Sequence, residues 1–183
     1  TAKREFFKTT SPSMDILVSS NLERLLYHVT GSDTEVAALM KSLTETGSYT
    51  VRPETLRTIQ ESFACGWSSE EQVAGEIRAR CEQDGYLCDT HTAVAFHVAA
   101  QHKRDGVPMV VLSTASPFKF PRSVLEALGQ TAPANDFEAM QQLEEITGRT
   151  APASLSALRR KAERFNTVID PEQIAQVALS YQA

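Results

Sequence analysis

Long apolar runs and an excess of basic residues are both missing from this 183-residue sequence. No apolar run approaches the ~20 residues that a membrane-spanning helix requires, and no apolar core of signal-peptide length follows the first residues. Acidic residues number 23 and basic residues 18, which gives a formal charge of −5, and the two signs are interleaved. A nucleic-acid-binding domain normally carries a basic face. The sequence therefore argues against both a membrane and a nucleic acid as partner.

Cysteine is scarce as well. Cys65, Cys81 and Cys88 are an odd number at wide spacing, and no two of them form a C-x-x-C pair. A zinc site normally needs clustered ligands, and a secreted disulfide scaffold needs more cysteines in a shorter chain. We therefore expect reduced thiols in a cytoplasmic protein.

The composition that remains is that of a folded protein. Apolar residues make up 42% of the chain and charged residues 22%, which is typical of a globular rather than a disordered protein. The length suits one domain or a part of one. Because the chain begins with Thr1 and not with methionine, we expect it to start inside a longer reading frame.

Helical patterns dominate the sequence. Apolar residues recur at spacings of three and four, and the stretches are bounded by residues that cap helices. Ser20 and Glu23 have the spacing of a capping box, in which the Ser20 hydroxyl bonds the amide of Glu23. The predicted helices begin near Ser20, Asp33, Pro53, Ser68, Asp89, Pro121 and Asp170.

Strand signals are few. Residues 109–112 read MVVL, a continuously apolar run that predicts a strand buried on both faces of a parallel sheet, and residues 165–169 predict a short edge strand. One buried strand cannot make a sheet, so partner strands must come from elsewhere. The fold class predicted is α/β, mostly helical and with few strands of its own.

Two sequence blocks carry a family resemblance. In the first block, residues 11–24 read SPSMDILVSSNLER. In the second, residues 89–93 read DTHTA and residues 106–121 read GVPMVVLSTASPFKFP. They resemble signatures of the threonine synthases, in the order and roughly at the spacing of that family. Ser116 and Phe118 depart from the pattern, since many members have a histidine and a small residue there.

The resemblance implies the C-terminal region of an enzyme of the tryptophan synthase β-like fold, with residues 1–183 forming part of the domain that binds pyridoxal 5'-phosphate (PLP) plus a C-terminal helical extension. Such an enzyme converts O-phosphohomoserine and water to L-threonine and phosphate. The family's Schiff-base lysine and glycine-rich cofactor-phosphate loop both precede the signature, and nothing here matches either. We therefore expect no catalytic residue in this chain, a missing N-terminal half as its partner, and no activity alone.

Ser113 and Thr114 follow the predicted strand, where open α/β sheets place their ligands. By resemblance, Thr114 is the threonine that hydrogen-bonds the pyridine nitrogen of the cofactor, with Ser113 beside it. A hydroxyl can meet this nitrogen without forcing a proton onto it. The alternative is that both residues only end a strand through bonds from side chain to backbone.

Substrate-binding candidates lie in both blocks. Ser20 and Asn21 present a hydroxyl, an amide and free backbone N–H groups, which suit the phosphate or the carboxylate of the substrate. Lys119, with Arg122 near it, supplies a cation at the start of the next predicted helix. The alternatives are a simple helix cap for the first pair and a solvated lysine for the second.

Asp89 and His91 suggest an acid–base pair, but an N-cap and a first-turn residue explain them as well. His91, His97 and His102 do not share a helical face at metal-ligand spacing, so no metal site is predicted. Two other functions stay open: a different PLP enzyme of the same fold, and a non-catalytic ligand-binding or interaction module derived from it.

Overall fold

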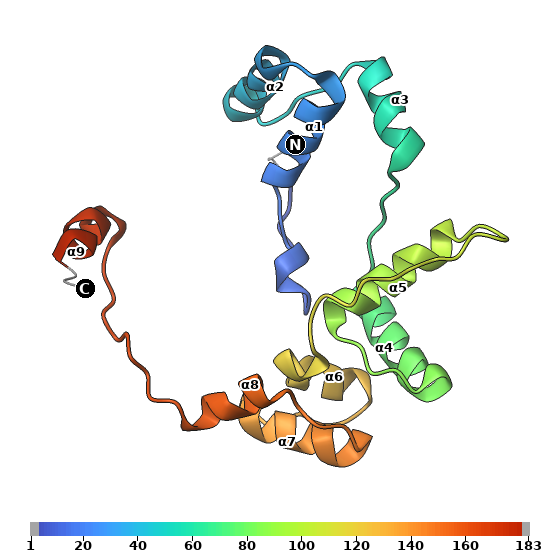
Figure 1. Cartoon of the computed structure of the whole chain (residues 1–183), viewed down its shortest axis with the longest axis vertical. Coiled ribbons are helices and arrows are strands. Elements are labelled where there is room, and N and C mark those ends of the chain that lie inside the picture. Colours follow the sequence, from blue (N-terminus) through green and yellow to red (C-terminus); the bar gives the residue numbers. More distant parts are fainter. Residues whose placement is uncertain (1–3, 181–183) are drawn as a thin grey trace.

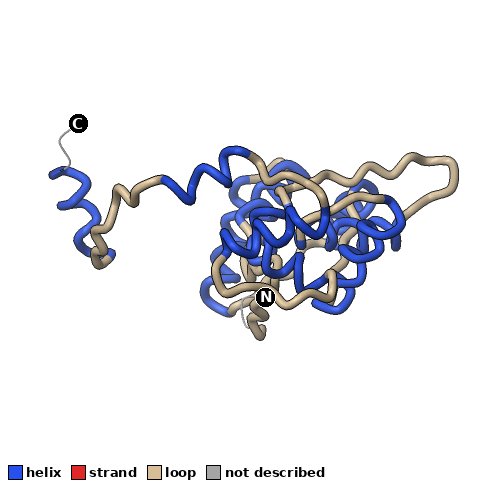
Figure 2. The backbone as a smooth tube through the Cα atoms, turned by 90° about the horizontal axis from the view of Figure 1, so that it is seen from below, coloured by secondary structure: helices blue, strands red, loops and turns tan. Residues whose placement is uncertain are grey.

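The structure is a computed structural model that describes residues 4–180, and over this range it contains helices and loops but no strand (Figure 2). None of the helices in the described range is both long and apolar enough to traverse a lipid bilayer. The α-helices are α1 (Ser20–Thr30), α2 (Asp33–Thr46), α3 (Pro53–Ser62), α4 (Glu70–Asp84), α5 (Thr90–His102), α6 (Pro121–Ala127), α7 (Asp136–Thr147), α8 (Ala153–Ser156) and α9 (Ile174–Ser180). Short 3₁₀ turns are η1 (Pro12–Met14), η2 (Pro117–Lys119), η3 (Ala157–Arg160) and η4 (Pro171–Gln173).

The hydrophobic core lies among α4, α5, α6 and α7, which we call the central helix group. Helix α4 packs against α5 and α6, and α6 packs against α7. Ile77 of α4, Leu125 of α6 and Leu143 of α7 are all fully buried in one cluster. Burial of side chains of this size contributes about 1.5–3 kcal/mol each, so this cluster, which includes Phe118, fixes the part of the chain that carries Lys119.

Helices α1, α2 and α3 form a second group, the N-terminal helix group, which lies at the top of Figure 1. Helix α1 packs against α2 and α3. The buried apolar residues of the N-terminal helix group are Leu26 of α1 and Val36 of α2, whereas Leu22 of α1 is 44% exposed. An extended segment before α1 and another after α3 connect it to the central helix group (Figure 1).

The predicted strand at residues 109–112 is wrong for this structure. The chain leaves α5, reaches outward and returns alongside it in an extended but unpaired conformation (Figure 1). Val110 is 77% exposed and Leu112 is 75% exposed. A strand requires neighbours that supply hydrogen bonds on its edges, and no other described segment is a strand.

The predicted edge strand at residues 165–169 is also wrong. These residues run extended, with Phe165 71% and Val168 96% exposed. They connect η3 to η4 and α9, which lie apart from the other helices (Figure 1). The final helix expected from Asp170 is confirmed as η4 and α9.

The predicted helices have bounds close to those observed, with one exception, whereas α7 and α8 were not predicted. Ser69 caps α4 in a reciprocal capping box with Gln72, and α2 and α4 end at Gly47 and Gly85, whose positive φ angles glycine adopts without strain. The capping box predicted at Ser20 is wrong. Ser19 occupies the N-cap with an extended backbone and makes no side-chain cap bond, so Ser20 is already the first helical residue.

Candidate functional site

The first turn of α5 is built around the carboxylate of Asp89, which is fully buried. One oxygen, Oδ2, accepts from the His91 amide at 3.1 Å and contacts His91 Nδ1 at 2.9 Å. The other, Oδ1, accepts from the Thr92 amide at 3.2 Å and from the Thr92 hydroxyl. Four donors therefore satisfy one carboxylate that no water reaches. The N-cap predicted at Asp89 is confirmed.

The imidazole of His91 is oriented by partners on both sides. Because Asp89 accepts, Nδ1 carries the proton and donates, which leaves Nε2 free to accept from the Ser13 amide at 3.3 Å. The ring also packs on Phe120, with centroids 4.8 Å apart. His91 is only 4% exposed, so it joins the SPSMD segment to the start of α6 through contacts that exclude solvent.

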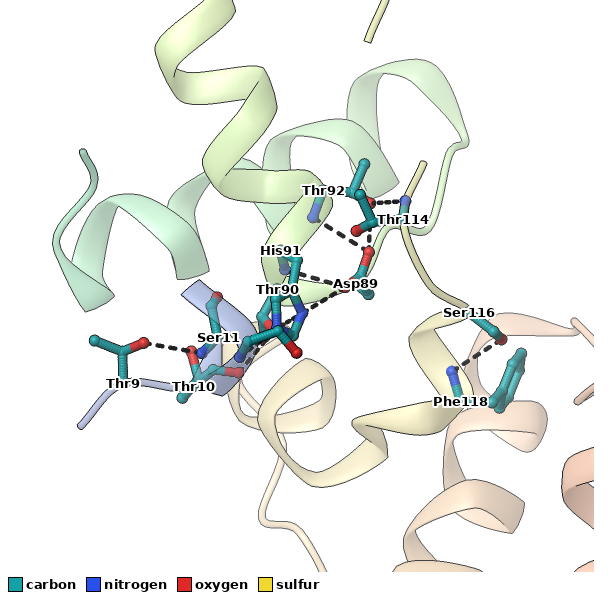
Figure 3. A network of polar contacts seen from close by, with 11 residues as sticks. Thr9, Thr10, Ser11, Asp89, Thr90, His91, Thr92, Thr114, Ser116 and Phe118 are labelled. Atoms are coloured by element: carbon teal, nitrogen blue, oxygen red, sulfur yellow. Dashed lines mark hydrogen bonds and ion pairs between the residues drawn. The ribbon is translucent and has the colours of Figure 1, made fainter. Parts of the chain in front are cut away.

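Three separate stretches of sequence meet at this turn (Figure 3). The Thr90 hydroxyl donates to the carbonyl of Thr10 at 2.7 Å, which adds a second tie to the N-terminal segment. On the other side, the amide of Thr114 donates to Thr92 Oγ1 at 3.2 Å. The same helix turn thus holds both segments on which the family resemblance depends.

Ser113 and Thr114 lie at the end of the extended segment that follows α5, and both are exposed. Within residues 4–180, the backbone amide of Thr114 is held by Thr92, but its side-chain hydroxyl makes no hydrogen bond. The hydroxyl is therefore free to bind a ligand, and it projects from a fixed backbone.

Lys119 and Arg122 line a cavity of about 530 Å³ between the N-terminal segment and the start of α6. The Lys119 ammonium lies 5.6 Å from the centroid of the Phe120 ring. Side chains of both charges line the cavity, so a bound anion would compete with the acidic side chains for the basic ones. Its lining residues are Lys8, Thr9, Thr10, Glu70, Lys119, Phe120, Pro121, Arg122, Ser123, Glu126 and Asp136.

Ser20 and Asn21 lie elsewhere, on the exposed first turn of α1. Asn21 Oδ1 accepts from Arg24 Nη1 at 2.9 Å. Neither residue lines the cavity at Lys119, and Figure 1 shows α1 at the top and α6 at the bottom. The structure therefore brings Lys119 close to Arg122 but does not bring Ser20 and Asn21 to them.

Cys88 precedes the capping aspartate and is 1% exposed. Burial, with a smaller contribution from the negative charge of Asp89, raises the pKa of the Cys88 thiol to about 12. The thiol therefore stays protonated at neutral pH and acts as a small apolar side chain. Within the described residues, no three histidine, cysteine or acidic side chains gather as a possible metal site.

Sequence reasoning missed the role of Thr92 and the tie between Ser13 and His91. The signal was the composition of the turn. Asp89 alone is enough to cap α5, yet residues 90–92 add two hydroxyls and an imidazole that a cap does not need. All three of these side chains are buried, which requires that each have a hydrogen-bond partner.

Comparison with known proteins identifies the family. A family model described as "Threonine synthase, C-terminal" matches residues 92–178. The threonine synthase of Pseudomonas aeruginosa is 35% identical over 170 residues, a match that covers 91% of this chain and 32% of that protein. The chain thus spans about a third of the length of that relative and about a quarter of the threonine synthase of Methylobacillus glycogenes, with which it is 36% identical over 126 residues.

Two solved structures resemble the chain. A crystal structure of PLP-bound threonine synthase from Brucella melitensis superposes with a TM-score of 0.78 at 34% identity and covers 96% of this chain and 34% of that one. Yeast threonine synthase superposes with a TM-score of 0.74 at 24% identity, over 96% of this chain and 36% of the other, and shows the shared fold. The mostly helical fold of the described residues therefore superposes on one portion of these larger enzymes. The chain therefore belongs to the threonine synthase family and corresponds to the C-terminal portion of its members.

Proposed function

We propose that this chain is the C-terminal part of a PLP-dependent threonine synthase, a lyase that converts O-phosphohomoserine and water to L-threonine and phosphate in threonine biosynthesis in the cytoplasm. The observation that carries the proposal is the superposition on the PLP-bound enzyme of Brucella melitensis over 96% of the chain. The residue that attaches the cofactor covalently lies in the N-terminal half, and the chain supplies binding groups.

Thr114 and Ser113 are the cofactor-binding residues of this proposal. When bound, the cofactor acts as an electron sink that stabilises negative charge on the substrate. The free hydroxyl of Thr114, on a backbone held by Thr92, suits a hydrogen bond to the pyridine nitrogen. Because a hydroxyl carries no charge, it sets the electron demand of the ring without requiring that the nitrogen be protonated.

Lys119 binds the substrate phosphate in this proposal. Its ammonium shares the cavity with Arg122, and a phosphate would gain charge-assisted hydrogen bonds from both. Ser20 and Asn21 bind the phosphate or carboxylate from the first turn of α1. Since that turn lies away from η2 and α6 (Figure 1), this part of the proposal requires α1 to approach them in the complete protein.

Exposed apolar side chains support the N-terminal half of the enzyme as the partner of this chain. Large apolar side chains stand exposed on the N-terminal segment, before α4 and on the segment after α5, at Phe7, Trp67, Val110 and Leu112. Exposure of each such group to water is unfavourable by roughly 1.5–3 kcal/mol relative to burial. The extended residues 109–112 also carry unpaired backbone groups that a neighbouring strand would satisfy.

Phosphate release from O-phosphohomoserine tests the proposal. The complete protein should release phosphate only with PLP present, whereas this chain alone should release none. Borohydride reduction in the presence of PLP should label the complete protein on one lysine and leave the isolated chain unlabelled. Stoichiometric labelling of one lysine in the isolated chain would overturn the assignment of the lysine to the N-terminal half.

A further inference from the structure

The Thr92 hydroxyl lies between the buried carboxylate of Asp89 and the backbone of Thr114 (Figure 3). Its proton is donated to Asp89 Oδ1, and its oxygen accepts from the Thr114 amide at 3.2 Å. A threonine hydroxyl has a single proton. Because that proton is committed to Asp89, the lone pairs face the Thr114 segment and the direction of the bond is fixed.

Capping of α5 does not explain this hydroxyl. The amides of His91 and Thr92 already donate to Asp89, so two orphan donors of the first turn are satisfied without it. Thr92 is 1% exposed, and a side chain with the shape of threonine but no hydroxyl would fill the same space. Besides donating to Asp89, the hydroxyl contributes the link to Thr114, 22 residues further along the chain.

The Thr114 segment has few other restraints. Residues 103–115 form no helix or strand, and the side chains of Ser113 and Thr114 are exposed to solvent. The first helical turn after them is η2, whose N-cap is Ser116. A single directional bond therefore sets the backbone from which the Thr114 hydroxyl projects.

We propose that Thr92 is a positioning residue that, oriented by Asp89, holds the Thr114 backbone so that the Thr114 hydroxyl meets the cofactor. This proposal rests on the cofactor role of Thr114 proposed above. Thr92 touches neither cofactor nor substrate, and it acts only through the Thr114 amide. Removal of the Thr92 hydroxyl should therefore weaken cofactor binding by no more than removal of the Thr114 hydroxyl does.

The experiment uses the complete protein with four variants: T92V, T92S, T114V and the double variant T92V/T114V. Valine keeps the shape of threonine without the hydroxyl, and serine keeps the hydroxyl without the methyl group. T92V should remove hydrogen-exchange protection at the Thr114 amide and weaken PLP binding about fivefold to tenfold, as expected for one lost hydrogen bond. T92S should restore both. The absorption maximum of bound PLP should shift in T92V in the same direction as in T114V.

The double variant decides whether Thr92 acts through Thr114. If it does, T92V/T114V should bind PLP no more weakly than T114V alone, since the two residues share one effect. H91N is a matched control on the same carboxylate: it can still donate to Asp89 but loses the bond to Ser13, so protection at the Thr114 amide should persist. If valine prevents folding, as judged by melting, T92A repeats the test with a smaller side chain.

Failure of each proposal gives a separate result. If T114V weakens PLP binding but T92V does not, or if the two effects add fully, Thr92 is not a positioning residue. If T114V binds PLP as tightly as the unaltered protein, the cofactor role of Thr114 is wrong. Retained protection of the Thr114 amide in T92V would overturn the positioning role whatever the binding data show.

Discussion

The central and N-terminal helix groups carry family motifs of equal clarity but are stabilised very differently. The central group buries apolar side chains from four helices in one cluster, whereas the N-terminal group buries Leu26 and Val36. Lys119 thus rests on a packed scaffold, Thr114 is tied to that scaffold through its bond to Thr92, and Ser20 and Asn21 rest on a lightly packed one. The difference shows that a motif readable in sequence need not be held in place by the chain that carries it.

The largest effect should come from truncating the core. Leu143→Ala removes a fully buried side chain and should lower the free energy of unfolding by about 2–5 kcal/mol. Leu22→Ala, on the half-exposed face of α1, should change it by less than about 0.5 kcal/mol. Urea denaturation of the isolated chain followed by circular dichroism measures both. Equal losses from the two substitutions would remove the distinction between the groups.

The second-largest loss of stability should come from the buried turn at Asp89, because this turn links the central group to the N-terminal segment. Asp89→Ala strands four donors in a dry site and should lower the free energy of unfolding by about 3 kcal/mol. Asn135→Ala is the matched control, since this N-cap of α7 is exposed and bonds two amides, and it should cost about 1 kcal/mol. A loss at Asp89 no larger than the loss at Asn135 would show that the buried network adds nothing beyond capping.

Substrate binding in the complete protein sharpens the comparison further. Lys119→Ala and Asn21→Ala should each raise KM for O-phosphohomoserine, by roughly tenfold or more, because charge-assisted contacts contribute about 1.5–3 kcal/mol. The turnover number should change less, since these contacts exist in ground and transition states alike.

Lys41→Ala is the control for charge in that experiment. Lys41 is an exposed lysine of α2 whose side chain pairs with Glu45 at 3.8 Å. It should leave KM unchanged. A raised KM for Lys119→Ala together with an unchanged KM for Asn21→Ala would place the substrate site in the central group alone.

Thiol chemistry should show the smallest effect. Cys65 lies exposed between the two groups, and its alkylation or replacement by serine should change stability by less than about 0.5 kcal/mol. Cys88 is buried with its pKa raised to about 12, so the reactive thiolate is almost absent at pH 8 and iodoacetamide should not label it in the folded chain. Mass spectrometry after timed labelling checks both. Labelling of Cys88 at the rate of Cys65 would mean that the central group opens readily.

Helix positions were accessible to sequence reasoning because their determinants are local. Asp89 and Ser69 cap helices through bonds to amides two or three residues away, and Gly47 and Gly85 end helices through their own backbone freedom. The error at Ser20 has a local cause too, since Ser19 and Ser20 are both good caps and only the backbone geometry distinguishes them.

Strand prediction failed for a non-local reason. Residues 109–112 have the composition of a buried strand, but a strand exists only where another chain segment pairs with it. The described residues provide no such segment. The composition of the run therefore indicates pairing with a strand outside this chain, and it does not give a strand within it. The exposed Val110 and Leu112 are the result.

The sequence by itself determined the family, most of the helices and the identity of Thr114 and Lys119 as candidate site residues, since motifs and caps depend on neighbouring residues. It did not predict α7 or α8. Only the tertiary structure decided which of them meet. It joined Ser13, His91 and Thr114 through one buried carboxylate, and it kept Ser20 and Asn21 apart from Lys119. Spacing along a chain cannot give such distances, because they depend on how apolar faces from distant helices pack together.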